Sequence, residues 1–234
     1  MSLPKLNSAR YSTNIPSTNK QISYRPYLVK EEKILMLALE SQDQQQIITA
    51  IKDVLESCIF DRVDVDDFTM FDVEYLFLML RSKSVGEVIS IKIKCEECEA
   101  PIDVAIDLND IVPPNVDKDM VISLSDDIGI TMKYPNIQAI GDIKEEDFTK
   151  ISGLTKLILS SIDSIYDADA VYNAKDSSPK ELEDFVDTFS TEQFMKVTKF
   201  FEDLPVLKHD INVHCVPCDH TTELELKGLQ SFFT

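Results

Sequence analysis

The stretch I-K-I-K-C-E-E-C-E-A-P-I-D-V-A-I, residues 91–106, places a Cys-x-x-Cys pair between two runs in which apolar and polar residues alternate. Alternation with a period of two is typical of a strand with one buried face, so the pair is predicted to lie at the turn of a two-stranded hairpin. Two thiolates are half of a tetrahedral zinc site, because a structural site usually has four protein ligands. The stretch therefore predicts a second pair elsewhere in the chain.

The second pair lies in D-I-N-V-H-C-V-P-C-D-H-T-T-E-L-E-L, residues 210–226, again at the centre of a predicted hairpin. We expect one structural zinc ion to be held by four thiolates, those of Cys95, Cys98, Cys215 and Cys218. Four thiolates leave no open coordination position, so such a metal would not be catalytic. Compact zinc motifs separate their pairs by roughly 15–20 residues. The much longer gap from residue 99 to residue 214 therefore predicts an insertion within a zinc-ribbon-like fold.

The cysteines have three other possible roles. A redox dithiol normally lies at a helix N-terminus, whereas both pairs are flanked by strand patterns. Disulfides need an oxidising compartment, and the opening residues 1–11 lack the apolar core of a signal peptide. Unliganded cysteines are the third alternative. His214 and His220 flank the second pair and could replace one thiolate, and Cys58 is expected to be a small buried hydrophobe on a helix.

The composition is that of a globular protein, with 44% hydrophobic and 28% charged residues among 234. No apolar run approaches the roughly 20 residues of a membrane span. A net charge of -19 would repel phosphate backbones, so nucleic acid is not an expected partner. The sequence contains no P-loop, G-x-G-x-x-G, H-E-x-x-H or G-x-S-x-G motif, and none of its three histidines is evidently paired with a nucleophile. An enzyme is therefore not expected.

The periodicities predict an α+β fold. Residues 10–28 resemble two short strands, residues 29–41 a short and mostly buried helix, and residues 45–59 a helix with one apolar face. We expect three parts: an N-terminal hairpin and helical region over 1–87, a zinc-ribbon-like β region over 88–143 and 205–234, and a long helical insertion over 144–204.

A further helix is predicted after Thr69, which can cap it with Asp72 placed three residues on. This helix is apolar on nearly every side, because Tyr75, Leu78 and Met79 lie outside its main apolar stripe. Such a helix is either central to a core or a docking surface for another protein. The core is favoured, because soluble monomers seldom expose so large an apolar stripe.

Residues 23–41, 70–87 and 126–135 resemble the baseplate protein family of T-even-type contractile-tailed bacteriophages, the family associated with assembly of the baseplate hub. The resemblance implies a hub subunit or an assembly chaperone that is absent from the finished particle. It also implies other baseplate hub or tail proteins as partners, and a location in the host cytoplasm during assembly or in the virion tail baseplate. An exposed apolar patch on the N-terminal helices would also favour a homo-oligomer. Because the resemblance is densest in the N-terminal helices, we expect an assembly interface there.

The alternative class of function is an acidic zinc-ribbon regulatory module. Such a module would bind host proteins, for example those of the transcription machinery, through its acidic surface. Co-sedimentation with hub proteins, compared with capture of a polymerase, would separate the two hypotheses.

Overall fold

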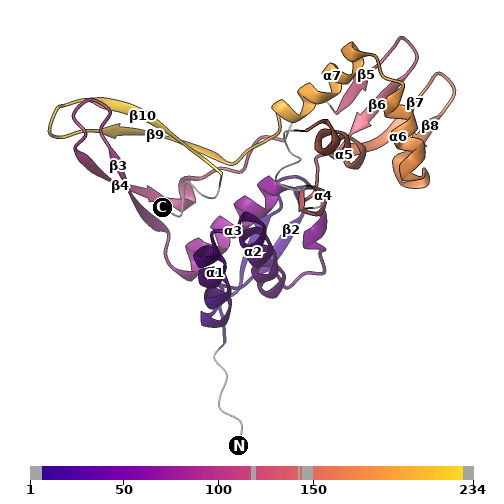
Figure 1. Cartoon of the computed structure of the whole chain (residues 1–234). Coiled ribbons are helices and arrows are strands. Elements are labelled where there is room, and N and C mark those ends of the chain that lie inside the picture. Colours follow the sequence, from indigo (N-terminus) through magenta and orange to yellow (C-terminus); the bar gives the residue numbers. More distant parts are fainter. Residues whose placement is uncertain (1–6, 117–119, 142, 144–149, 229–234) are drawn as a thin grey trace, which may run out of the picture. The chain divides into compact units, whose positions relative to one another are not determined.

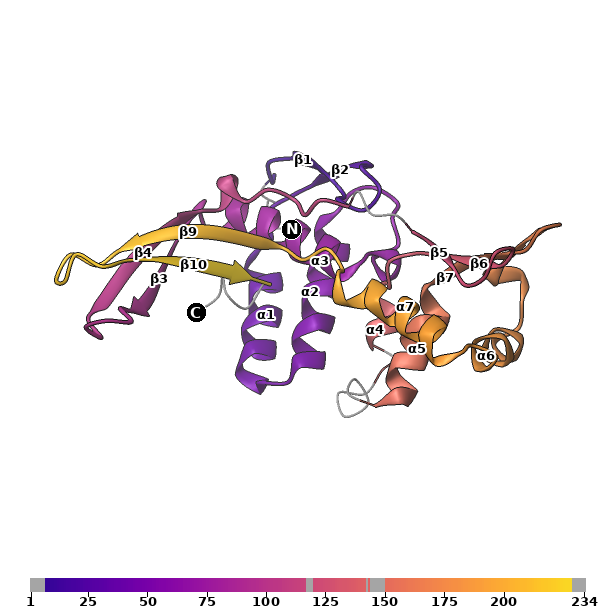
Figure 2. The same ribbon diagram turned by 90° about the horizontal axis from the view of Figure 1, so that it is seen from above.

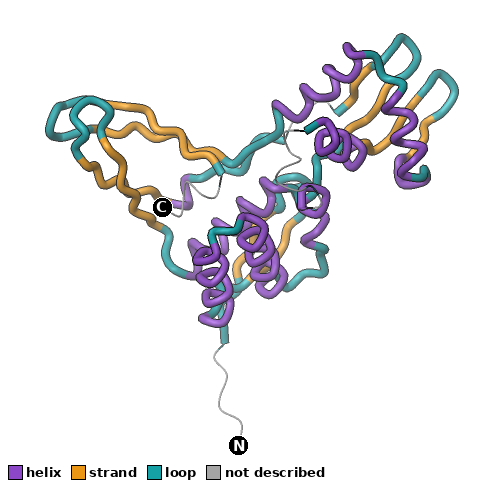
Figure 3. Tube along the Cα trace, in the orientation of Figure 1, coloured by secondary structure: helices purple, strands orange, loops and turns teal. Residues whose placement is uncertain are grey.

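The computed structural model describes residues 7–116, 120–141, 143 and 150–228, which form a mixed fold of helices and antiparallel strands (Figures 1 and 3). The chain divides into two compact units. The first comprises Met1–Val116 together with Pro205–Thr234, and the second comprises Asp117–Leu204. The predicted α+β class is confirmed by this content of helices and strands.

The first unit begins with a short hairpin and three helices. The antiparallel strands β1 (Tyr11–Asn14) and β2 (Gln21–Tyr24) pair with Tyr11 opposite Tyr24. They are followed by α1 (Val29–Ser41), α2 (Gln44–Cys58), the short 3-10 helix η1 (Val65–Asp67) and α3 (Met70–Ser84). Inward side chains of β2, α2 and α3 are buried, among them Ile22, Val54, Leu55, Leu76 and Leu80.

The predicted cap of α3 is confirmed. The Asp72 backbone N–H donates to Thr69 Oγ1 at 3.2 Å, and the Thr69 N–H donates to the Asp72 carboxylate at 3.0 Å. The backbone N–H groups at the start of a helix have no acceptor within the helix, and this cap satisfies two such donors. The buried Asp72 carboxylate also accepts from the Ser17 backbone N–H at 2.8 Å, so the same side chain anchors the turn between β1 and β2.

Helix α3 is a central core helix. Its buried apolar residues cover several sides, and Leu78 is completely buried. Leu78 belongs to a cluster that includes side chains from both cysteine hairpins. The chain itself therefore covers the side of α3 that a docking helix would have left open.

Helix α1 differs from the prediction. Residues 29–41 do form a helix, but the expectation that it is mostly buried is wrong: only Glu31 and Ala38 are buried. Four of its apolar side chains are exposed, Ile34 by 42%, Met36 by 56%, Leu37 by 67% and Leu39 by 51%. The reason is that α1 packs chiefly against α2 on one side, while its apolar residues extend around the helix.

Two hairpins of matching length complete the first unit. Strands β3 (Val88–Lys94) and β4 (Pro101–Asp107) form the first, and β9 (Lys208–His214) and β10 (Thr221–Lys227) form the second. The 3-10 helix η2 (Leu108–Asp110) follows β4. Inward side chains of the hairpins share one buried cluster with α3, comprising Leu78, Ile89, Ile91, Ile106, Leu108, Ile111, Leu207 and Leu226. Segments far apart in sequence are thus brought together, as Figure 1 shows.

The second unit contains a four-stranded antiparallel sheet in the order β5-β6-β7-β8. Its strands are β5 (Val121–Ser123), β6 (Gly129–Met132), β7 (Ile162–Tyr166) and β8 (Val171–Asn173). Its helices are α4 (Ile137–Gly141), α5 (Ile151–Ser161), η4 (Ala174–Asp176), α6 (Pro179–Asp187) and α7 (Thr191–Glu202). Side chains of the sheet and of α5, α6 and α7 form one core, and Figure 2 shows these helices on one side of the strands.

This sheet differs from the sequence-based expectation of a helical insertion over 144–204. Strands β7 and β8 lie inside that range, and β7 pairs with β6, which was assigned to the ribbon region. The sequence gives no local signal of the change, because α5 ends at Ser161 and β7 begins at Ile162 with no glycine or proline between them. Hydrogen bonds to β6, a distant segment, convert the apolar continuation of the helix into a strand.

Candidate metal centre

The first Cys-x-x-Cys pair is held in a tight turn between β3 and β4. The Cys95 backbone N–H donates to the Ala100 carbonyl at 2.9 Å, and the Glu99 N–H donates to the Cys95 carbonyl at 3.0 Å. Glu99 has a positive φ of 57°, a left-handed conformation that is uncommon for a residue with a side chain. The turn therefore reverses the chain directly after the second cysteine.

The second pair repeats this geometry between β9 and β10. The Cys215 backbone N–H donates to the His220 carbonyl at 2.8 Å, and the Asp219 N–H donates to the Cys215 carbonyl at 2.8 Å. Asp219, at the position equivalent to Glu99, has a φ of 60°. The two knuckles are thus the same local structure built twice.

All four predicted ligands lie together at the tips of the hairpins. The Sγ atoms of Cys95 and Cys218 are 3.6 Å apart, as are those of Cys98 and Cys215. All four Sγ atoms lie within 4.8 Å of one another. Four sulfurs bound to zinc at about 2.3 Å would be separated by ~3.8 Å at the corners of a regular tetrahedron, so the cluster has the size of a zinc site. In each pair the first cysteine is buried and the second is exposed.

Neither flanking histidine belongs to the cluster. Among the residues that the structure describes, the four cysteines form the one group with metal-ligand spacing. The exposed His214 ring has Nε2 3.4 Å from the Asp219 carboxylate and Nδ1 3.4 Å from Thr221 Oγ1. His220 contributes its backbone carbonyl to the knuckle. A full set of thiolates is therefore the donor set that the geometry favours.

The cluster distributes negative charge unevenly among its thiols. Hydrogen bonds, first from the Cys98 backbone N–H and then from Glu97 and neighbouring thiols, lower the pKa of Cys95 to about 6. Burial is the main cause that raises the pKa of Cys215 to about 12. Zinc binds thiolates rather than thiols, so occupation of this site by zinc would release protons and would strengthen as pH rises.

Cys58 lies apart from the cluster, as predicted. It is the last residue of α2 and is almost completely buried. Burial raises the pKa of its thiol to about 11. It therefore packs as a small hydrophobic side chain and serves as an internal comparison for the four clustered cysteines.

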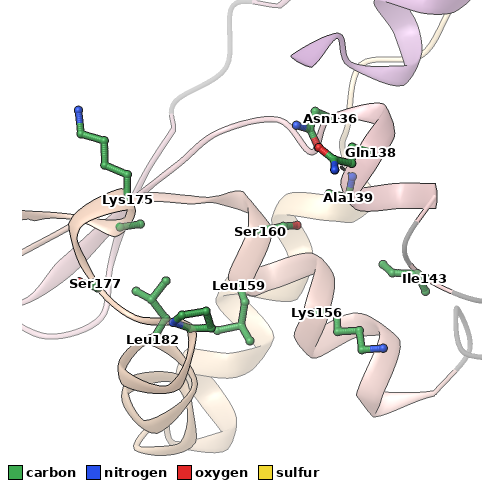
Figure 4. A pocket seen from close by; sticks show the side chains of 12 residues that line it. Asn136, Gln138, Ala139, Ile143, Lys156, Leu159, Ser160, Lys175, Ser177 and Leu182 are labelled. Atoms are coloured by element: carbon green, nitrogen blue, oxygen red, sulfur yellow. Dashed lines mark hydrogen bonds between the residues drawn. The ribbon is translucent and has the colours of Figure 1, made fainter. Parts of the chain in front are cut away.

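A cavity in the second unit has a volume of ≈ 630 Å³ (Figure 4). Its described lining includes Lys156, Lys175, Asn136 and Gln138, but neither a carboxylate nor a histidine nor a cysteine. Figure 4 shows the two lysine side chains extending away from each other. Catalytic sites need polar groups that converge on one point, and the described residues of this lining show no such set.

The fold and the cluster define a class: an α+β protein in which two identical knuckles, distant in sequence, bring four cysteines to one point. The model of a family described as T4 bacteriophage base plate protein matches residues 8–234, and the chain belongs to that family. This finding confirms the resemblance noted from the sequence. Searches of curated protein sequences and of solved structures found no significant match. In the described part of the chain, no helix is both long and apolar enough to cross a bilayer.

Proposed function

We propose that this baseplate protein acts in assembly of the baseplate hub, as a subunit or as an assembly chaperone, without catalysing a reaction. The observation that carries the proposal is the family match over residues 8–234, which includes both units and both knuckles. We infer hub or tail proteins as its partners and the host cytoplasm as the place of assembly. The family match gives no support to the alternative of a regulatory module for host proteins.

We also propose that the four cysteines hold one structural zinc ion. The hairpins share a buried cluster with α3 near their bases, while the cysteines lie at their tips. A two-stranded hairpin is marginally stable by itself, so the tips need a further link. Zinc at Cys95, Cys98, Cys215 and Cys218 would supply that link without opening a coordination position for chemistry.

Metal analysis of the full chain, prepared without chelator, tests the zinc proposal. We expect about one zinc per chain from a closed site of four thiolates. Cys215→Ser should abolish stoichiometric zinc and lower the melting temperature of the first unit, because metal-binding free energy at a structural site is folding free energy. The matched control is Cys58→Ala, which should retain zinc because Cys58 lies outside the cluster. Wild-type protein without zinc would contradict the proposal.

Mass spectrometry of hub precursors isolated from infected cells, alongside purified virions, tests the assembly role. The protein should be present in the precursor at a fixed ratio to other hub proteins. Presence in the virion as well would identify a subunit, whereas loss on maturation would identify a chaperone. Absence from both, with recovery of a host protein on the isolated chain, would instead support the regulatory alternative.

A further inference from the structure

The exposed side of α1 carries a short pattern that is complementary to itself. Lys33, Met36, Leu37 and Glu40 occupy positions i, i+3, i+4 and i+7, which lie on one face of a helix. All four are exposed. The face thus has two apolar residues in the middle, a positive charge towards its N-terminal end and a negative charge towards its C-terminal end. We call these four residues the α1 stripe.

We propose that the α1 stripe is the contact through which two copies of this chain pair, with their α1 helices antiparallel. A two-fold axis between residues 36 and 37 would place Lys33 of each copy opposite Glu40 of the other. The same axis would place Met36 of each copy opposite Leu37 of the other. The contact is isologous, so each complementary pair occurs twice. A parallel arrangement would instead bring like charges together, Lys33 against Lys33.

The exposed apolar side of α1 supports the presence of a second protein surface against it. A helix that is apolar on most sides is normally covered, yet α1 packs chiefly against α2. Beside the stripe lies a groove of ≈ 410 Å³ between α1 and α2, which Ile34, Leu37, Ala38 and Ala50 line on its apolar side and Gln45, Gln46, Thr49 and Asp53 on its polar side. Figure 2 shows α1 at the edge of the helical layer, beside α2. A second helix laid along the stripe would cover Leu37 and the adjoining edge of this groove.

The charges of α1 favour a second copy in spite of the chain's net charge of -19. On the exposed side of α1, Lys33 and Glu40 carry opposite charges, while Lys30 pairs with Glu31 at 3.1 Å. The acidic residues elsewhere on the chain repel those of a second copy over longer distances. Salt screens this repulsion beyond about 8 Å at physiological ionic strength. Added salt should therefore favour pairing until the local ion pairs are themselves weakened.

Charge reversal within the stripe tests the arrangement, with sedimentation equilibrium of the purified full chain as the measurement. Lys33→Glu should raise the dissociation constant of the dimer about tenfold, because it converts two attractive contacts into repulsive ones. Glu40→Lys should do the same. The double variant, Lys33→Glu with Glu40→Lys, should restore wild-type affinity, and a mixture of the two single variants should form heterodimers in preference to homodimers. Lys180→Glu makes the same change in net charge on α6 and should leave dimerisation unchanged.

Sedimentation equilibrium of the purified chain tests dimerisation without any hub protein. A wild-type chain that stays monomeric at all accessible concentrations overturns the inference, even if it binds a hub partner through α1. A dimer that tolerates both single reversals, or one that the double reversal does not restore, also overturns it, because the contact then lies elsewhere or in another orientation. Since pairing and the hub role are measured separately, either can fail without the other.

Discussion

Helices α1 and α3 have similar sequences in one respect: apolar residues occur on nearly every side of both. In the structure α3 is buried, with Leu78 fully covered, whereas α1 exposes Met36 and Leu37. The difference arises from the chain that follows them. Two hairpins return over α3 and share its core, while α1 packs chiefly against α2. An apolar helix therefore indicates that its surface will be covered. The rest of the fold determines whether the same chain or another molecule covers it.

The two helices also begin in different ways. Helix α3 has a reciprocal cap in which Thr69 and the buried Asp72 satisfy each other's backbone donors. Helix α1 begins after Leu28, and the buried Glu31 compensates for the missing polar cap: its carboxylate accepts from the Leu28 backbone N–H at 2.8 Å and from Arg25 at 2.8 Å. The start of α1 thus depends on an ion pair, which makes its stability sensitive to acid.

The largest effect is expected at Leu78. Leu78→Asp would place an unpaired charge where the side chain is fully buried between α3 and the hairpins, at a cost of more than about 4 kcal/mol. We expect the first unit to lose its cooperative melt by circular dichroism. Leu78→Ala should be milder, at about 2–5 kcal/mol. A Leu78→Asp protein that melts like the wild type would contradict the central position of α3.

An intermediate effect is expected at Glu31, and it should depend on pH. Burial opposes ionisation of this carboxyl, but hydrogen bonds from Arg25, Leu28 and Lys30 together lower its pKa from 4.5 to about 2. Because the folded pKa lies below the unfolded one, the stabilisation is present above pH 4.5 and is lost as pH falls towards 2. Its size at neutral pH is about 3 kcal/mol.

Denaturant titrations of Glu31→Gln check this expectation. At neutral pH the variant should be less stable than the wild type, and the difference should shrink as pH falls through the window between the two pKa values. Glu32→Gln is the matched control, because Glu32 is exposed on the same helix. A difference that does not change with pH would show that Glu31 acts through packing rather than through charge.

The sequence was sufficient to predict each cysteine knuckle, and the preference of zinc for four ligands predicted that the two knuckles would meet. Each Cys-x-x-Cys pair lies between alternating runs, so its local turn could be anticipated, and the two knuckles are near-copies of one local structure. The cap of α3 by Thr69 was predictable for the same reason, since only residues close in sequence take part. Features that depend on neighbouring residues alone leave a direct trace in the sequence.

Features that depend on distant partners left a weaker trace. Residues 162–166 continue an apolar helical pattern, and only pairing with β6 makes them a strand. The exposure of Leu37 likewise depends on which segments return over α1, and spacing within the helix carries no information about that. The i, i+3, i+4, i+7 arrangement of the α1 stripe was nevertheless present in the sequence, and its charged ends distinguish it from the buried face of α3.

The smallest effect on the isolated fold is expected at Leu37, which makes it the sharpest contrast with Leu78. Leu37→Glu keeps a good helix former on an exposed position, so the free energy of unfolding of the monomer should change by less than about 0.5 kcal/mol. Pairing should be lost, because the new charge would lie against Met36 of the second copy. Dimerisation stabilises the folded state by mass action, so the wild-type melting temperature should rise with protein concentration. The melting temperature of Leu37→Glu should not rise with protein concentration.

If both proteins melt independently of concentration, α1 is not covered by a second copy. If the variant unfolds at low concentration, Leu37 belongs to the core and the contrast between the two helices disappears.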